Sequence, residues 1–159
     1  MRPDDAEYQA LLELRTGLRR FLRWSEHQAK AVGLTPAQHQ LLLAIRGHPD
    51  PKGPTIGEVA AYLLLRHHSA VGLVDRAESA GFVARGHDPD NHTIVRLRLT
   101  SKGSEQIEGL SELHLEELSH LAPAMHALWD ALERAGHPEA PEERHPAAPP
   151  RSARAAAER

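Results

Sequence analysis

The chain has 159 residues, no cysteine, and a formal net charge of −3 at pH 7 with its 12 histidines counted as neutral. This length suits one domain with a tail, and a chain without cysteine forms no disulfide, thiolate metal site or thiol redox switch. No apolar run approaches the roughly 18 residues of a membrane span, and the polar start "MRPDDAEYQA" is not a secretory signal, so we expect a cytoplasmic protein with no membrane partner.

The N-terminal part of the chain predicts two helices. Residues 3–33 carry leucines and aromatic residues at helical spacing, open with the capping-box pair Asp4 and Glu7, and end at a glycine. Residues 34–48 predict a second helix, because Thr35 and Gln38 form a second capping box around a proline at the first helical position. The stretch "HPDPKGP" that follows is read as a loop.

The middle of the chain predicts two short helices and a β-hairpin. Residues 55–65 open with a third capping box. In the next helix, which should stop at Gly81, one buried face is expected from Ala70, Leu73, Val74 and Ala77. Beyond it, Val95, Leu97 and Leu99 alternate with arginines, which is strand spacing, and "DPDN" supplies a turn between two strands.

The C-terminal part predicts two more helices and a tail. Helical spacing resumes over residues 100–121, and "PAMHALWDALERAG" predicts a last helix that ends at Gly136. Residues 137–159 hold five of the 12 prolines among Ala, Glu and Arg, which predicts a disordered tail. We therefore expect one mainly α-helical domain over residues 1–136.

The order of two short helices, a tight turn and a hairpin predicts a winged helix-turn-helix over residues 33–99, with the hairpin as the wing. Its second helix would bury one face and offer the opposite face to the major groove of DNA. Small and hydrogen-bonding side chains suit that face, because base edges come close to it. The candidate residues are His67, His68, Ser69, Val71, Gly72 and Arg76.

The pieces "LTPAQ", "LVDRAESAGFV" and "LTSKG", in this order and spacing, resemble the MarR family of transcriptional regulators. The resemblance implies a homodimer formed by residues 1–32 and 100–136, a pseudo-palindromic DNA operator, and a small-molecule effector bound between the dimerisation and DNA-binding parts. It implies a ligand-responsive repressor that is not an enzyme and needs no cofactor. It also places a ligand pocket at Trp24, His27, His39, Leu43 and His114, although these side chains would equally suit a filled core.

The sequence departs from the family pattern in the DNA-binding lobe. The wing tip of the family often carries arginines, whereas His92 stands here between Asn91 and Thr93, and a neutral imidazole lacks the charge that a narrow minor groove attracts. Arg66 replaces the usual small hydroxyl residue at the helix cap and is also a candidate for DNA contact. On the hairpin, Arg85, Arg96 and Arg98 are candidates for phosphate contact or for simple solvation. Arg76 either reaches a phosphate or pairs with Asp75 or Glu78.

The sequence leaves three other functions to compare with DNA binding. A zinc-responsive regulator would draw ligands from His27, His39, Glu116 and His120, but no compact ligand motif occurs, so no metal is predicted. The nearly neutral lobe would also fit a protein-interaction module that no longer binds DNA. An enzyme is disfavoured, because the sequence has no phosphate-binding glycine loop, G-x-S-x-G elbow or cysteine nucleophile.

Overall fold

The computed structural model describes residues 4–134, which form six helices and one antiparallel hairpin. The predicted tail at 137–159 and the helix stop at Gly136 lie outside the described residues. In chain order the elements are α1 (Asp5–Ala31), α2 (Pro36–Arg46), α3 (Ile56–Tyr62), α4 (His67–Ser79), β1 (Val83–His87), β2 (Val95–Leu99), α5 (Ser101–Ser119) and α6 (Ala122–Arg134). The fold predicted from the sequence, mainly α with a two-stranded wing, is confirmed.

Local capping chemistry explains where several helices begin. Capping boxes start α1 at Asp4, α2 at Thr35 and α3 at Thr55, as the sequence predicts. Thr100 caps α5 by accepting from the backbone N–H of Gly103. Arg66 precedes α4 and makes no side-chain capping bond, so this helix depends on its buried face for stability.

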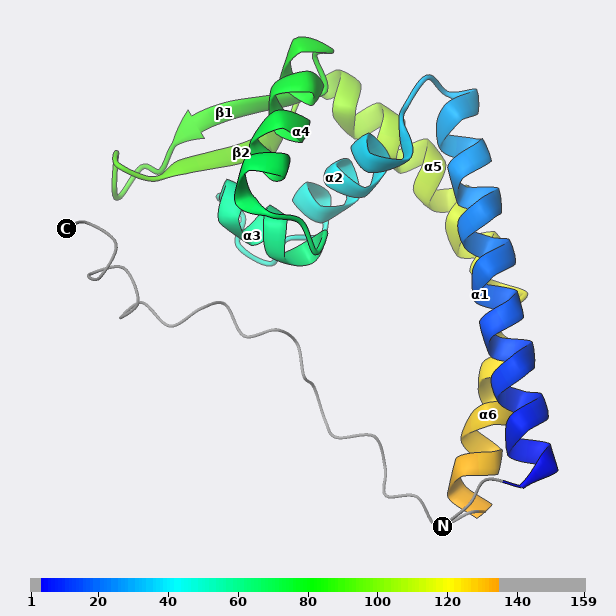
Figure 1. The fold of residues 1–159 in the computed structure, drawn as a ribbon. Coiled ribbons are helices and arrows are strands. Elements are labelled where there is room, and N and C mark those ends of the chain that lie inside the picture. The colour runs from blue at the N-terminus through cyan, green and yellow to red at the C-terminus, as the bar shows by residue number, and fades with distance from the viewer. Residues whose placement is uncertain (1–3, 135–159) are drawn as a thin grey trace.

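The elements form a compact lobe and a long arm (Figure 1). The lobe contains α2, α3, α4 and the hairpin, in which Val83 pairs with Leu99 and His87 pairs with Val95. The arm contains α1, α5 and α6, and α6 packs beside the N-terminal half of α1 (Figure 1). Gly17 permits a close approach there, because a Cβ at this position would stand 2.5 Å from a methyl carbon of Leu121.

The core lies where α4, α2, the hairpin and α5 meet. The predicted buried stripe of α4 is confirmed: Ala70, Leu73, Val74 and Ala77 are all buried. They share one cluster with Leu41 and Leu42 of α2, Leu97 of β2 and Ile107 of α5. The far end of the hairpin extends beyond this core, and Val95 is exposed there.

The arm leaves much apolar surface uncovered. Among the described residues, exposed large apolar side chains gather on α1, α5 and α6: Leu11, Leu12, Leu18, Leu22, Leu113, Leu115, Leu118, Met125 and Trp129. Apolar surface of this extent on one chain is typical of an interface. No helix in the described range is long and apolar enough to cross a bilayer.

Candidate nucleic-acid interface

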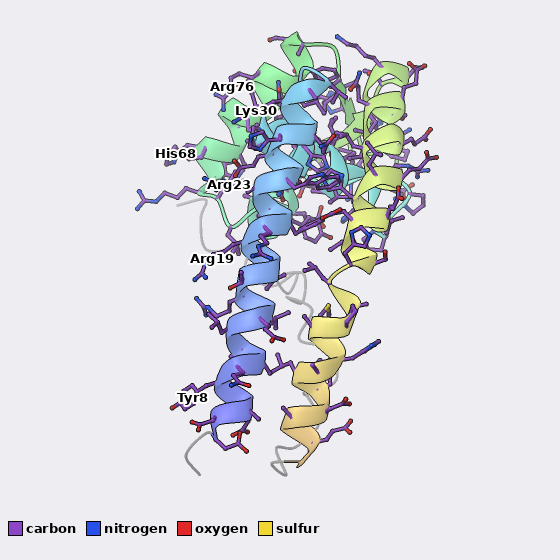
Figure 2. The ribbon with its side chains drawn as sticks, turned by 90° about the vertical axis from the view of Figure 1, so that its right-hand side faces the viewer. Tyr8, Arg19, Arg23, Lys30, His68 and Arg76 are labelled. Atoms are coloured by element: carbon purple, nitrogen blue, oxygen red, sulfur yellow. The ribbon has the colours of Figure 1, made fainter. Side chains whose placement is uncertain are left out.

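The outer face of α4 carries the side chains predicted to read DNA. His67, His68, Ser69 and Arg76 are exposed, and Val71 and Gly72 are half-buried beside them. Figure 2 shows His68 and Arg76 projecting from the same side of the helix. This face lies opposite the buried stripe, so α4 presents a row of imidazole, hydroxyl and guanidinium groups on a packed base.

Gly72 has a specific role on this face. A Cβ at this position would stand 3.4 Å from Nη1 of Arg76, so the guanidinium lies over the glycine. Of the two open alternatives for Arg76, pairing with Asp75 or Glu78 is wrong, because Arg85 of β1 occupies both carboxylates. No ion pair of Arg76 is found within residues 4–134, and its charge faces solvent.

Arg85 acts as a brace between the wing and the recognition helix. Its Nη2 lies 2.5 Å from Oδ1 of Asp75, and its Nη1 donates to Glu78. The prediction of a phosphate contact or a simply solvated side chain for Arg85 is therefore corrected. The sequence separates these partners by seven and ten positions across a helix end, which local patterns do not connect.

Arg96 is a structural residue, and its assignment to the DNA-contact set is also corrected. Its side chain is only 13% exposed. Its Nε donates to Oδ2 of Asp88 at 2.9 Å, and its Nη1 donates to the carbonyl oxygen of Gly53 at 3.1 Å. Asp50 and Glu58 complete the surrounding carboxylates, each 3.7 Å from Nη1. The arginine thus joins the wing to the loop between α2 and α3.

Asp88 is the acidic centre of this junction, and the sequence analysis missed it. Its buried carboxylate accepts from the backbone N–H of Asp90 and from Arg96, while Lys52 lies 3.6 Å away. The backbone N–H of Asp90, followed by Arg96 and Lys52, lowers the pKa of Asp88 to about 2. A polar turn such as "DPDN" gives no sign that its first carboxylate will be buried.

Of the wing residues predicted to contact DNA, His92 and Arg98 stay exposed. The backbone carbonyl of His92 lies 2.8 Å from Nδ1 of His87, which steadies the hairpin loop and leaves the His92 ring outside. Arg98 lies on the same strand face as Arg96, but the carbonyl oxygen of Gly53 accepts from Arg96, whereas Arg98 stays exposed. These two residues therefore remain candidates for DNA contact.

The predicted ligand pocket is a filled joint between α1, α2 and α5. His39 and His114 are buried with ring centroids 4.6 Å apart, and Trp24 lies 4.9 Å from His114. Nε2 of His114 lies 2.7 Å from the hydroxyl of Ser25. Burial is the main cause that lowers the pKa of His39, and the neighbouring His114 lowers it further. No buried side-chain polar atom in the described part of the chain lacks a hydrogen-bond partner.

Two of the five predicted pocket residues lie elsewhere. His27 is exposed and its Nδ1 bonds to the carbonyl oxygen of Arg23, and Leu43 is 48% exposed. Their positions correct the predicted pocket. A groove of about 540 Å³ lies instead between α1, α5 and α6, lined by residues that include Leu12, Arg20, Phe21, Glu117, His120 and Leu121.

The residues considered for zinc do not converge. His120 contacts Glu117 at 3.2 Å, while the ring of His39 lies tilted against that of His114 in the joint. Across residues 4–134, no group of three or more metal-ligating side chains is found.

Comparisons with known proteins agree with this geometry. A sequence model of the MarR family matches residues 32–92, which include the helix-turn-helix and most of the wing loop. YkoM of Bacillus subtilis, described as an uncharacterized HTH-type transcriptional regulator, is 27% identical over 99 residues. That match spans 60% of this chain and 62% of YkoM, so the chain aligns with less than two thirds of its relative.

Solved structures share the fold over most of the chain. A MarR family protein from Bacillus stearothermophilus is 26% identical with a TM-score of 0.62, covering 83% of this chain and 91% of that protein. S. aureus MepR in complex with DNA has the same TM-score of 0.62 at 16% identity, covering 77% of this chain and 88% of MepR. At that identity the MepR match shows the fold alone.

Proposed function

The chain belongs to the MarR family of winged helix-turn-helix transcriptional regulators, and we propose that it binds a pseudo-palindromic DNA operator as a homodimer and represses transcription. Members of this family are transcription regulators and not enzymes. The proposal includes release of DNA by a small-molecule effector. It also includes location in the cytoplasm, where such a regulator meets its operator.

One observation carries the DNA-binding part of the proposal: the exposed face of α4. His68 and Ser69 stand at its N-terminal end, where a recognition helix approaches base edges. Gly72 has no side chain in the middle of the face, so DNA can approach the helix closely there. Arg76 supplies a positive charge further along the helix. A major groove about 12 Å wide admits a helix of this kind.

The homodimer is supported by the apolar side of α1. Leu11, Leu18 and Leu22 are exposed on one side of this helix, and Trp129 of α6 is exposed on the arm as well. A second copy would cover these side chains. The dimer would then carry two α4 helices related by a two-fold axis. Half-sites about 34 Å apart, or multiples of that distance, then match the two-fold symmetry of a palindromic operator.

The effector part of the proposal fits the groove between α1, α5 and α6. Its volume of about 540 Å³ lies within the roughly 300–1,000 Å³ typical of small-molecule sites. Phe21 and Leu121 provide apolar walls, and the groove is also lined by polar groups of both charges: Arg20, His120, Glu13 and Glu117. The packed joint around His114 has every buried polar atom satisfied, which favours the groove over the joint.

The test is binding of the full chain to the DNA that flanks its own gene, measured by fluorescence anisotropy. Ser69→Ala and His68→Ala should each change the preference for operator over unrelated DNA, by roughly 1–3 kcal/mol for a lost base contact. Ser79→Ala is the matched control, because its hydroxyl already bonds to the carbonyl oxygen of Asp75 within α4. Equal binding to all sequences by the wild type would refute operator recognition.

A second measurement separates this function from a winged-helix interaction module. Operator affinity should fall steeply with salt, with a log–log slope of about −0.9 per phosphate contact. Sedimentation at micromolar concentration should show a dimer, and Leu22→Glu should shift it toward monomer. A salt-insensitive interaction, or a wild-type monomer, would contradict the corresponding part of the proposal.

A further inference from the structure

We propose that the outer face of α1 is a second DNA-contacting surface, which binds the sugar-phosphate backbone beside the groove that α4 reads. This inference rests on the proposed function and extends the DNA contact beyond the helix-turn-helix and wing. We call the surface the α1 cationic strip and define it by Arg19, Arg23 and Lys30.

The first support is charge. Between residues 15 and 30, α1 carries five cationic side chains and a single carboxylate, Glu26, in a chain whose formal net charge is −3. All five cations are exposed, and none takes part in the ion pairs found among the described residues. They are Arg15, Arg19, Arg20, Arg23 and Lys30.

The second support is direction. At about 100° per residue, Arg19, Arg23 and Lys30 fall within about 40° of one another around the helix. Figure 2 shows these three side chains on the same side of the molecule as His68 and Arg76 of α4. The strip covers about 16 Å along the helix axis, a length over which one DNA strand presents about five phosphates.

The third support is that most cations of the hairpin and of the loop at Gly53 are already paired. Arg85, Arg96 and Lys52 are held in ion pairs, and the wing tip offers a histidine in place of an arginine. Phosphate contacts dominate the affinity of proteins for DNA. The α1 cationic strip supplies positive charge that the wing of this chain lacks.

The surroundings of the strip leave it open to DNA and disfavour other approaches. Leu11, Leu18 and Leu22 lie about 60–140° around α1 from the strip members, so a dimer partner can cover the leucines without covering the strip. The outward face of α5 repels a polyanion, because it carries four exposed carboxylates at helical spacing: Glu105, Glu108, Glu112 and Glu116. DNA is therefore drawn to the side that bears α4 and the strip.

The experiment measures binding of the full chain to two duplexes, operator DNA and a random sequence, across a salt series. Arg19→Gln, Arg23→Gln, Lys30→Gln and the triple variant are compared with the wild type. A homodimer carries each residue twice, so each single substitution should flatten the log–log slope by up to about 1.8 units, from about 0.9 per phosphate contact. Affinity should fall on both duplexes alike, because phosphates carry no sequence.

Lys102→Gln is the matched control. Lys102 lies at the start of α5, outside the strip, and its Nζ donates to the carbonyl oxygen of Ala80 at 2.9 Å. It removes the same charge and should leave the salt slope unchanged. Circular dichroism and sedimentation confirm that each variant is folded and dimeric.

The measurements on the two duplexes distinguish this inference from the proposed function. If the wild type binds both duplexes equally, operator recognition fails, while the slope on random DNA still tests the strip. If the triple variant keeps the wild-type slope on both duplexes, the strip does not touch DNA and the inference is overturned. Loss of binding together with dissociation to monomers would also overturn it, because the strip would then be a dimer contact.

Discussion

The hydrogen bond between Ser25 and His114 offers a direct test of how the arm is joined to the lobe. Both residues are buried, and the hydroxyl of Ser25 lies 2.7 Å from Nε2 of His114. Nδ1 of the same ring lies 2.6 Å from the carbonyl oxygen of Leu110. Since a carbonyl only accepts, Nδ1 carries the proton, and in the neutral ring Nε2 must accept from the serine.

Ser25→Ala therefore leaves a buried acceptor without a donor. Such a loss costs about 1–3 kcal/mol of unfolding free energy. In a chain of this size each kcal/mol shifts the melting temperature by roughly 2–4 °C, so a decrease of about 2–12 °C is expected. Ser119→Ala is the control, because that exposed hydroxyl bonds to Glu116 within its own helix, and it should stay within about 0.5 kcal/mol of wild type.

A double-mutant cycle makes the prediction specific to the pair. His114→Phe together with Ser25→Ala removes both polar partners, which is less costly than stranding one of them. Urea denaturation followed by circular dichroism, at one fixed protein concentration, should thus show that the double variant loses less than the two single losses added together. Additive losses, or a Ser25→Ala variant as stable as wild type, would refute the hydrogen bond as a stabilising link.

Three further outcomes are expected. Burial lowers the pKa of His39 below 6.5, so the unfolded state binds protons more readily than the folded state. Urea titrations should therefore show the free energy of unfolding falling from pH 8 to pH 5. The fall should be smaller in the His39→Gln variant. Gly103→Ala should lower the melting temperature, at a cost of about 1–3 kcal/mol or more, because its Cβ would stand 2.1 Å from the carbonyl oxygen of Phe82. Gly109→Ala, in open space on the same helix, should instead stabilise by up to about 1 kcal/mol. Leu64 has φ +54° and is 92% exposed, so Leu64→Gly should raise the melting temperature by relieving about 1 kcal/mol of backbone strain; an unchanged or lower value would contradict this.

The helices could be predicted from the sequence because their signals are local. Each capping box places two interacting side chains three residues apart, and the three predicted boxes at Asp4, Thr35 and Thr55 all form. The buried face of α4 was equally readable, since its four apolar residues repeat with the helical period. The tight order of helix, turn, helix and hairpin then leaves few ways to bury those faces together.

The candidate site was less predictable, because its ion pairs join segments that are distant in the chain. Arg96 and Arg98 share one face of β2, and alternation treats them alike. Only the folded chain brings the loop at Gly53 over the first of them, 43 residues away in sequence. The N–H of Leu97 also donates to Pro54 at 2.8 Å, which fixes this loop along the strand.

The histidines show the same limit and why it matters for function. In the sequence, His39 and His114 look no different from His68 or His92, but the fold divides them into a buried pair and an exposed pair. Burial lowers the pKa of His39, so protonation of this one ring acts against the packing of the arm on the lobe. The fold, and not the sequence pattern, therefore decides which histidines stabilise the joint and which can meet DNA.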